Sequence, residues 1–521
     1  MTNIAEARRV IEQASALGAT DFCVCAGSRN SPLLAVLGAS DLRVYSFVDE
    51  RSAAFFALGR AKLTGRPAAV VTTSGTAVAE LLPAAIEAHY SGTPLVLITA
   101  DRPARYRGTG APQSIEQEEI FGVYARGSVV HINVEFDEPL IDEEVLWSAG
   151  VSPAGPAEPA LSVAEGSSPP NARLAAASVI NKRWRVCRFG SEDAAGPAGE
   201  DASVPVALRA RPLVILGGLH ESDRPRVREF TQKLNAPVYA ESLSGLREDP
   251  ALAHLLITAG ERMIGRGDFD SVIRIGNVPT LRFWRDLDES RRDLPLISFS
   301  ALPFTGCSRG EVHPLESLPS DITPRERNDA FFADDRERAA AIAQILDDEP
   351  NSELAMFREL SRSIPSNARV YLGNSLPIRE WDLAAIREPR DFEIAANRGA
   401  NGIDGQLSTF FGQCDPSRPN VCVVGDLTAI YDSNAPWIVP QLDPAIDWRI
   451  VIINNGGGRI FSRVPSLRKL DASMRERIIE NAHSIRFDHW AAMWGIEDRV
   501  TELRPDAEAS GRAWARYDAL W

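Results

Sequence analysis

The 521-residue sequence predicts an α/β protein with three doubly wound parallel-sheet domains. Two observations carry this prediction. Short apolar runs alternate with helically spaced segments through most of the chain, which is the rhythm of β-loop-α units. One stretch rich in Ala, Pro, Gly and Ser interrupts that rhythm and reads as a linker. We therefore expect domains at 1–150, 206–345 and 346–521, with a linker and an insert at 151–205.

In the first domain, helical spacing runs from Ala5 to Leu17 and an apolar strand from Asp21 to Ala26. The segment 27–33 then opens a helix. The remaining elements alternate in the same way, with strands at 44–48, 68–75 and 94–100 and helices at 49–63 and 76–90.

The linker contains one segment, Leu174 to Phe189, that reads as a helical or extended insert. The second domain restarts the α/β pattern, with strands at 211–218, 237–241, 270–277 and 294–300 and a connecting helix at 333–346. The third domain has its strands within 368–375, 392–405, 420–427 and 449–457. The chain then ends in a helical pattern, and we expect no closing strand at this edge of the third domain.

Bulk composition describes an ordinary globular protein, with 44% hydrophobic and 24% charged residues. No apolar run is long enough to span a membrane, and the N-terminus lacks the layout of a secretion signal. A formal charge of −15 argues against sequence-independent binding of nucleic acid. The six cysteines have no zinc-like spacing, so buried reduced thiols and a cytoplasmic location are expected.

The most informative feature is a pair of strand ends. One apolar run breaks at Gly425-Asp426, and the next breaks at Asn454-Asn455 and three glycines. Neighbouring parallel strands would bring Asp426 and Asn455 to the same sheet edge, where α/β proteins bind ligands. Their oxygens suit Mg²⁺, and the glycines would let the backbone approach a diphosphate. The alternative is a glycine-rich turn with a capping aspartate.

Glu50 follows the strand at 44–48 and starts the helix at 49–63. This places it at a strand's carboxyl edge. An acidic residue in a first turn also complements the helix dipole, so a purely structural role is the alternative.

Several loops at strand ends carry arginines, although the protein is acidic overall. Backbone amides, hydroxyls and guanidinium groups at such places favour carboxylate ligands. The alternative for Ser28 is a helix N-cap, and for Arg29 a surface position. The small residues of 72–78 form a turn that could approach a ring. The polar candidates are Ser28, Arg29, Arg102, Gln113, Ser375, Arg379 and Arg398.

The seven histidines fall in none of these loops, and no nucleophile elbow or HExxH motif occurs. A site without an obvious His, Ser or Cys catalyst is easier to explain if a cofactor performs the difficult step.

Taken together, these motifs resemble the MenD family of thiamine-diphosphate enzymes, the 2-succinyl-5-enolpyruvyl-6-hydroxy-3-cyclohexene-1-carboxylate synthases of menaquinone biosynthesis. The resemblance is dense in 1–120 and 370–465. It rests on GSRNSPL, FVDERSAAFFALGRAK, VVTTSGTAVAELLPAAIEA, LITADRP, NRGANGIDG, VVGDLTAIYD and INNGGGRIF.

The resemblance implies a pyrimidine-binding domain first, a central domain without cofactor, and a diphosphate-binding domain last. It makes Glu50 the carboxylate that activates the cofactor, and Asp426, Asn455 and the Gly457 carbonyl the ligands of Mg²⁺ or Mn²⁺. Ile403 would support the bent cofactor. The cofactor contacts would be completed by Gly425, Leu427, Thr428, Gly458 and Ile460.

The implied reaction is decarboxylation of 2-oxoglutarate and 1,4-addition of the succinyl-semialdehyde carbanion to isochorismate. Arg29, Arg102 and Arg398 would hold isochorismate, whereas Ser375 and Arg379 would hold the succinyl carboxylate. The remaining implied substrate contacts are Ser28, Gln113, Arg282 and Phe461. Active sites would lie between subunits of a homodimer or homotetramer.

One residue departs from the family pattern, because Pro112 stands where asparagine is common. Two rival functions stay open at this point. One is another thiamine-diphosphate 2-oxoacid decarboxylase or acetolactate-type synthase, and the other is a non-catalytic nucleotide-binding α/β protein.

Overall fold

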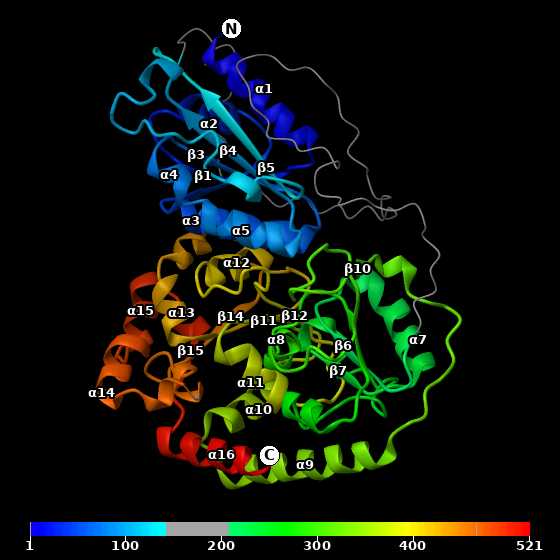
Figure 1. Ribbon diagram of the computed structural model, residues 1–521. Coiled ribbons are helices and arrows are strands. Elements are labelled where there is room, and N and C mark those ends of the chain that lie inside the picture. The colour runs from blue at the N-terminus through cyan, green and yellow to red at the C-terminus, as the bar shows by residue number, and fades with distance from the viewer. Residues whose placement is uncertain (1, 142–207, 465) are drawn as a thin grey trace. The chain divides into compact units, whose positions relative to one another are not determined.

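Three parallel sheets of five strands each form the framework of the chain in a computed structural model (Figure 1). The structure describes residues 2–141, 208–464 and 466–521. The predicted fold class is confirmed. The predicted linker at 151–205, its insert at Leu174 to Phe189 and Cys187 lie outside the described residues.

The first sheet has the strand order β2-β1-β3-β4-β5, and every neighbouring pair is parallel. Strands β1, β3 and β4 are buried along their whole length, as continuous apolar runs require in a sheet covered on both faces. Its strands are β1 (Asp21–Cys25), β2 (Arg43–Phe47), β3 (Ala68–Thr72), β4 (Leu95–Asp101) and β5 (Val129–Glu135). Its helices are α1 (Asn3–Ala16), α2 (Ser31–Gly38), α3 (Glu50–Thr64), α4 (Thr76–Ala79) and α5 (Leu82–Ser91).

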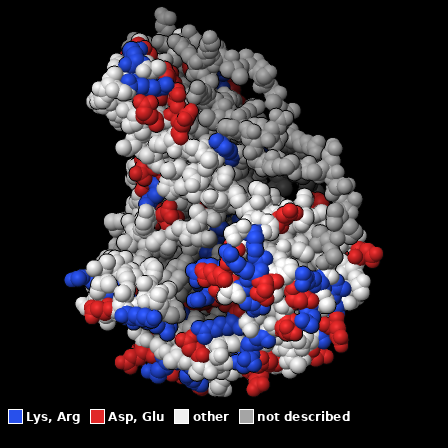
Figure 2. Space-filling view, viewed as in Figure 1, with Lys and Arg blue, Asp and Glu red and all other residues white. Residues whose placement is uncertain are grey.

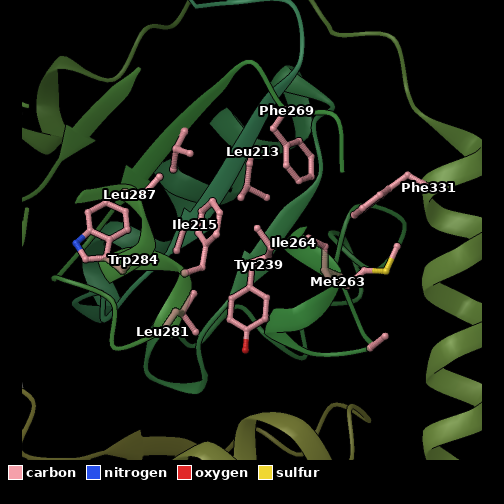
Figure 3. Packing of buried hydrophobic residues seen from close by; sticks show 14 of the residues in the cluster. Leu213, Ile215, Tyr239, Met263, Ile264, Phe269, Leu281, Trp284, Leu287 and Phe331 are labelled. Atoms are coloured by element: carbon pink, nitrogen blue, oxygen red, sulfur yellow. The ribbon is translucent and has the colours of Figure 1, made fainter. Parts of the chain in front are cut away.

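The second sheet has the order β10-β9-β8-β6-β7. A cluster of large apolar side chains packs on one face of it, with Trp284, Tyr239 and Phe269 around Ile215 (Figure 3). The strands are β6 (Pro212–Leu216), β7 (Val238–Ala240), β8 (Ser271–Ile275), β9 (Leu296–Phe299) and β10 (Val312–His313). The helices are α7 (Arg224–Leu234), α8 (Arg282–Glu289) and α9 (Asp329–Asp348).

The third sheet has the order β12-β11-β13-β14-β15. Its central strand β13 pairs with β14 over six registered positions, which fixes the ends of the two strands at the same edge. The strands are β11 (Arg369–Leu372), β12 (Glu393–Ala395), β13 (Asn420–Gly425), β14 (Trp448–Ile453) and β15 (Val500–Leu503). The helices are α10 (Glu353–Ser363), α11 (Leu376–Ala384), α12 (Gln406–Gln413), α13 (Asp426–Tyr431), α14 (Ala472–Met474), α15 (Phe487–Trp494) and α16 (Ala507–Ala519).

Strand β15 corrects the expectation that the third domain has no further strand after residue 457. It pairs with β14 in parallel and forms the sheet edge that was in doubt. Its residues are half-buried or exposed, so it lacks the continuous apolar run by which the inner strands were recognised.

Two helix boundaries also differ from the prediction. The helix expected at 76–90 is divided into α4 and α5, with Pro83 in the first turn of α5, where its missing N–H costs no hydrogen bond. Helix α2 begins only at Ser31, because the side chain of Asn30 bonds back to the Gly27 N–H and the Cys25 carbonyl. The residues before Asn30 form a turn rather than a first helical turn.

The chain divides into two compact units. One holds the first sheet, and the other holds the second and third sheets together with Ile86–Gly92. Within the second unit, the fully buried Arg247 joins the two sheets' domains, because its guanidinium donates to the carbonyls of Trp381 and Ala385 in and after α11. The second and third sheets therefore belong to one compact unit.

Charged side chains of both signs are intermixed on the face seen in Figure 2. None of the described helices combines the length and the apolarity that crossing a membrane requires. The cysteines of the described residues are free thiols, and all but Cys307 are buried, which confirms the expected reduced cysteines in this part of the chain.

Candidate active site

The ends of β13 and β14 bring two predicted loops together. Gly425 stands opposite Ile453 in the sheet, and Asp426 begins α13 immediately after β13. The Asp426 Oδ2 accepts the backbone N–H of Gly456 at 2.8 Å and that of Gly457 at 2.9 Å. The carboxylate therefore fixes the glycine loop against the neighbouring strand end. The two strand ends meet at one sheet edge as expected, and these two hydrogen bonds are those of the capping aspartate that the sequence left open as the alternative.

The oxygen atoms around this edge suit a hard cation. Asn455 carries a buried Oδ1 that has no hydrogen-bond partner in the described part of the chain. Beside it are the Asp426 carboxylate and the carbonyl of Gly457, which accepts one hydrogen bond from the Arg459 N–H at 2.8 Å. A backbone carbonyl has a second lone pair, so all three oxygens can serve a cation such as Mg²⁺ or Mn²⁺.

The conformation of the glycine loop admits no side chain at its centre. Gly457 has φ +136°, and a Cβ there would lie 2.6 Å from the carbonyl oxygen of Glu480. Gly458 donates its N–H to that same oxygen at 2.6 Å. The segment from Glu480 to His483 thus packs closely against the loop and leaves its other side open to a ligand.

One cavity collects every predicted cofactor contact except Glu50. It lies at the edge of the third sheet, and residues of β13, β14, α10, α11, α13 and the intervening loops line it. Ser375 and Phe461, which were predicted as substrate contacts, also line it. The predicted cofactor residues in its wall are Ile403, Gly425, Asp426, Leu427, Thr428, Asn455, Gly457, Gly458 and Ile460.

A second cavity adjoins the first and shares Leu376 and Ile460 with it. Arg282 and Arg379 line this second cavity. Arg379 lies within α11 and not in a loop as expected, and its Nη1 donates to the Ser375 carbonyl at 2.5 Å. Arg282 is the first residue of α8, and its N–H is held by Glu261 at 2.9 Å. The two predicted arginines thus line one cavity from two helices, α8 beside the second sheet and α11 beside the third.

Arg398 is linked to the first cavity by a hydrogen bond to Asn374, which lines that cavity. Its Nη1 donates to the Asn374 Oδ1 at 2.6 Å, while its Nη2 is buried and lacks a partner in the residues that the structure describes. Burial lowers the pKa of Arg398 to about 10. A buried guanidinium with an unused donor is suited to a carboxylate ligand.

The other predicted residues lie at the carboxyl edge of the first sheet. Glu50 is the first residue of α3 and is half-buried. Burial raises the pKa of Glu50, and the nearby carboxylates of Asp49 and Glu80 raise it further. A carboxylate that holds its proton more firmly than usual is suited to sharing a proton with a nitrogen base.

Arg29 and Ser28 do not take the alternative roles considered for them. Arg29 is buried, donates to the Phe136 carbonyl at 3.0 Å and pairs with Glu138 at 3.3 Å, so it is no loose surface residue. Ser28 is exposed in the turn, and Asn30 occupies the N-cap position of α2.

The loops after β1, β3 and β4 converge at this edge. A Cβ on Gly27 would lie 2.5 Å from the Thr73 Cβ, and one on Gly75 would lie 3.1 Å from the Gln113 Cα. Arg102 directly follows β4, and its Nε is buried without a hydrogen-bond partner in the described residues. The Gly27 turn, which precedes Ser28, therefore lies against Thr73, and the Gly75 turn lies against Gln113.

Two residues at the site escaped sequence analysis. The expectation that no histidine falls in a site loop overlooked His483, whose Nε2 lies 3.3 Å from the Asp426 Oδ2. Glu353 also lines the cofactor cavity and accepts the Asn455 Nδ2–H at 2.9 Å. Neither has a local signal, because His483 lies in an irregular segment and Glu353 reads as an ordinary first-turn acid after a serine N-cap.

Comparisons with known proteins agree with the geometry. Residues 6–120 match the family described as "Thiamine pyrophosphate enzyme, N-terminal TPP binding domain". The whole chain is 40% identical to a 2-succinyl-5-enolpyruvyl-6-hydroxy-3-cyclohexene-1-carboxylate synthase of Bdellovibrio bacteriovorus, covering 100% of both sequences. It is 38% identical to the synthase of Akkermansia muciniphila, over 92% of this chain and 88% of that protein. The synthase of Bacillus velezensis is 32% identical, over 93% of this chain and 88% of that protein.

Proposed function

This chain belongs to the 2-succinyl-5-enolpyruvyl-6-hydroxy-3-cyclohexene-1-carboxylate synthase family, and we propose how its own residues divide that family's reaction between them. It is a thiamine-diphosphate-dependent transferase of menaquinone biosynthesis. It decarboxylates 2-oxoglutarate and adds the succinyl-semialdehyde unit to isochorismate. The observation that supports the assignment of residues most strongly is the single cavity lined by nine predicted cofactor contacts.

The cation and the diphosphate take the glycine-loop end of that cavity in this proposal. Asp426, the Asn455 side chain and the Gly457 carbonyl bind Mg²⁺ or Mn²⁺, supported by the buried unpartnered Asn455 Oδ1. Gly458 offers a backbone without a side chain to the diphosphate. Ile403 and Ile460 in the cavity wall would offer apolar contacts to the cofactor's rings. When bound, thiamine diphosphate supplies the carbanion equivalent that both chemical steps need.

Glu50 performs the proton chemistry. Its carboxyl group would hydrogen-bond the aminopyrimidine and share a proton with the ring nitrogen, and its raised pKa keeps that proton on the carboxyl group up to a higher pH. The carboxyl group that exchanges the proton thus belongs to the first unit, whereas the oxygens proposed to bind the metal belong to the second.

The substrate carboxylates are divided between the two groups of arginines. The cavity lined by Arg379 and Arg282 receives the succinyl carboxylate, and Ser375 at its border contributes a hydroxyl. Arg398 with its unused Nη2 binds isochorismate together with Arg29 and Arg102. Ser28 and Gln113 add polar contacts to isochorismate, and Phe461 closes the apolar side.

A two-substrate assay tests the reaction. Purified protein with Mg²⁺ and thiamine diphosphate is incubated with 2-oxoglutarate and isochorismate, and the loss of isochorismate absorbance is followed. We expect turnover only when both substrates are present. Turnover with pyruvate and none with 2-oxoglutarate would instead indicate a different 2-oxoacid decarboxylase or an acetolactate-type synthase. Binding of nucleotides without any turnover would favour the non-catalytic alternative.

We also propose that the protein is a cytoplasmic homodimer or homotetramer. In this assembly Glu50 of one chain would contact the cofactor bound by its partner. The free thiols support the cytoplasmic location. Subunit mixing tests the shared site. Glu50→Gln and Asp426→Ala chains, each inactive alone, are denatured, mixed and refolded together. We expect activity to return, because a mixed dimer has one site with neither change; no recovery, with mixed dimers present, would contradict a shared site.

A further inference from the structure

The side-chain amide of Asn455 has one bonded end and one open end. Its Nδ2 donates to the Glu353 Oε1 at 2.9 Å, and its Oδ1 is buried without a hydrogen-bond partner in the residues that the structure describes. A carboxylate accepts hydrogen bonds and cannot donate them. Glu353 therefore dictates which end of the amide faces it, and the oxygen must face elsewhere.

Glu353 is itself held in place from two elements. It begins α10, where the Ser352 Oγ caps the helix by accepting the Ala355 N–H at 3.2 Å. Its own N–H donates to the Oγ of Ser510 in α16 at 2.9 Å. The residue is only 3% exposed. An acid in a first helical turn normally faces solvent, so this buried position needs another reason.

The buried negative charge has a compensating partner. A second buried carboxyl group, that of Glu380, faces the same cation as Glu353. Arg463 donates to the Glu380 Oε1 at 2.7 Å and lies 3.8 Å from the Glu353 Oε2. The guanidinium of Arg463 in turn lies over the Trp514 ring, 3.6 Å from its centroid. The cation of Arg463 thus compensates the two buried carboxyl groups.

We propose that Glu353 is a positioning residue for cation binding: it orients the Asn455 amide so that Oδ1 is presented to the metal. The inference rests on the proposed function, since it needs the cation site of the cofactor cavity. In this role Glu353 acts on the cation through the Asn455 side chain that it bonds. Partners that orient a ligand in this way typically contribute 10- to 100-fold to metal affinity.

The test is Glu353→Gln, which preserves size but replaces a pure acceptor by a carboxamide that can donate. The Gln NH₂ group can then pair with the Asn455 Oδ1 and remove it from the cation. We expect the dissociation constant of Mn²⁺, measured by electron paramagnetic resonance with thiamine diphosphate present, to rise at least about tenfold. Glu359→Gln is the matched control, because Glu359 lies on the same helix with an exposed side chain. Its Mn²⁺ affinity should equal that of the wild type.

A charge swap separates orientation from mere loss of a buried acid. Asn455→Asp places two carboxylates against each other and should weaken Mn²⁺ binding. The double variant Glu353→Gln/Asn455→Asp restores a donor and an acceptor in the pair. It should bind Mn²⁺ more tightly than either single variant. It also keeps one carboxyl and one carboxamide group, so it remains decisive if a single variant fails to fold.

Two results would overturn the inference. One is an unchanged Mn²⁺ affinity in a folded Glu353→Gln protein, and the other is a double variant that binds Mn²⁺ no more tightly than the better-binding of the two single variants. Failure of the proposed function gives a different result, because wild-type protein would then bind thiamine diphosphate without any dependence on Mg²⁺ or Mn²⁺.

Discussion

The carboxylate of Asp426 spans the gap between two strand ends and accepts the Gly457 N–H at 2.9 Å. Its position depends on the parallel register of β13 and β14, which brings Gly425 opposite Ile453. The same oxygen, Oδ2, also accepts the Gly456 N–H. Asp426 therefore shapes the glycine loop in addition to its proposed role as a cation ligand.

Replacing Asp426 by alanine should weaken metal-dependent binding of the cofactor strongly, by more than about tenfold, because both a ligand and the loop's anchor are lost. Calorimetric titration with thiamine diphosphate at several Mg²⁺ concentrations measures this. Asp443→Ala, at an exposed position in the connection between β13 and β14, is the control. Unchanged cofactor affinity in the Asp426 variant would exclude its role as a ligand.

Glu50→Gln should abolish turnover and leave cofactor binding nearly intact, because the amide cannot exchange a proton with the aminopyrimidine. The neighbouring Asp49 supplies a matched control. Its side chain caps α3 by accepting the Ser52 N–H, so Asp49→Ala should cost about 1 kcal/mol of stability and preserve turnover. Steady-state rates and calorimetric cofactor titrations distinguish the two variants. Substantial residual turnover in Glu50→Gln would contradict the catalytic role.

Arg379→Met should raise KM for 2-oxoglutarate at least about tenfold while cofactor affinity stays the same, since a charge-assisted hydrogen bond to a carboxylate is lost. The methionine keeps most of the apolar stem in the cavity wall. Initial rates are measured at varied 2-oxoglutarate with isochorismate saturating, and at varied isochorismate with 2-oxoglutarate saturating. Arg362→Met, at an exposed position on α10, should behave as wild type. An equal rise in KM for both substrates would place Arg379 elsewhere in the reaction.

The free energy of unfolding should decrease as pH rises from acidic to neutral, because Glu241 loses its proton in this range. Burial raises its pKa to about 7, and the charge of Asp382 adds to this. The folded state therefore holds the proton more firmly than the unfolded state. The stabilisation is complete below the unfolded pKa of about 4.3 and is lost as pH rises to about 7, by up to about 4 kcal/mol.

The comparison is between wild type and Glu241→Gln in thermal unfolding at pH 5 and pH 8. Glutamine still accepts the Thr280 N–H that Glu241 accepts at 2.9 Å. From pH 5 to pH 8, the unfolding temperature of the variant should fall by less than that of the wild type. Equal losses in both proteins would show that Glu241 does not titrate in this range.

The sequence was a good guide wherever a local pattern expressed the structure directly. Strands β13 and β14 are buried apolar runs, so their ends and the meeting of Asp426 with the glycine loop followed from parallel pairing. Strand β15 was missed because an edge strand with Thr501 and Glu502 has no such run. The bond between Asn455 and Glu353 joins residues 102 positions apart, and no local pattern encodes a contact of that kind.

The glycine loop also limits which of its positions can accept substitutions during evolution. Gly457 is excluded from substitution twice, by its backbone angle and by the Glu480 carbonyl 2.6 Å from where a methyl group would stand. At Gly456 a methyl group would meet nothing nearer than 3.5 Å, although its φ of +78° still disfavours most residues. Asparagine tolerates such an angle best, so inherited variation in this run should begin at Gly456 and spare its neighbour.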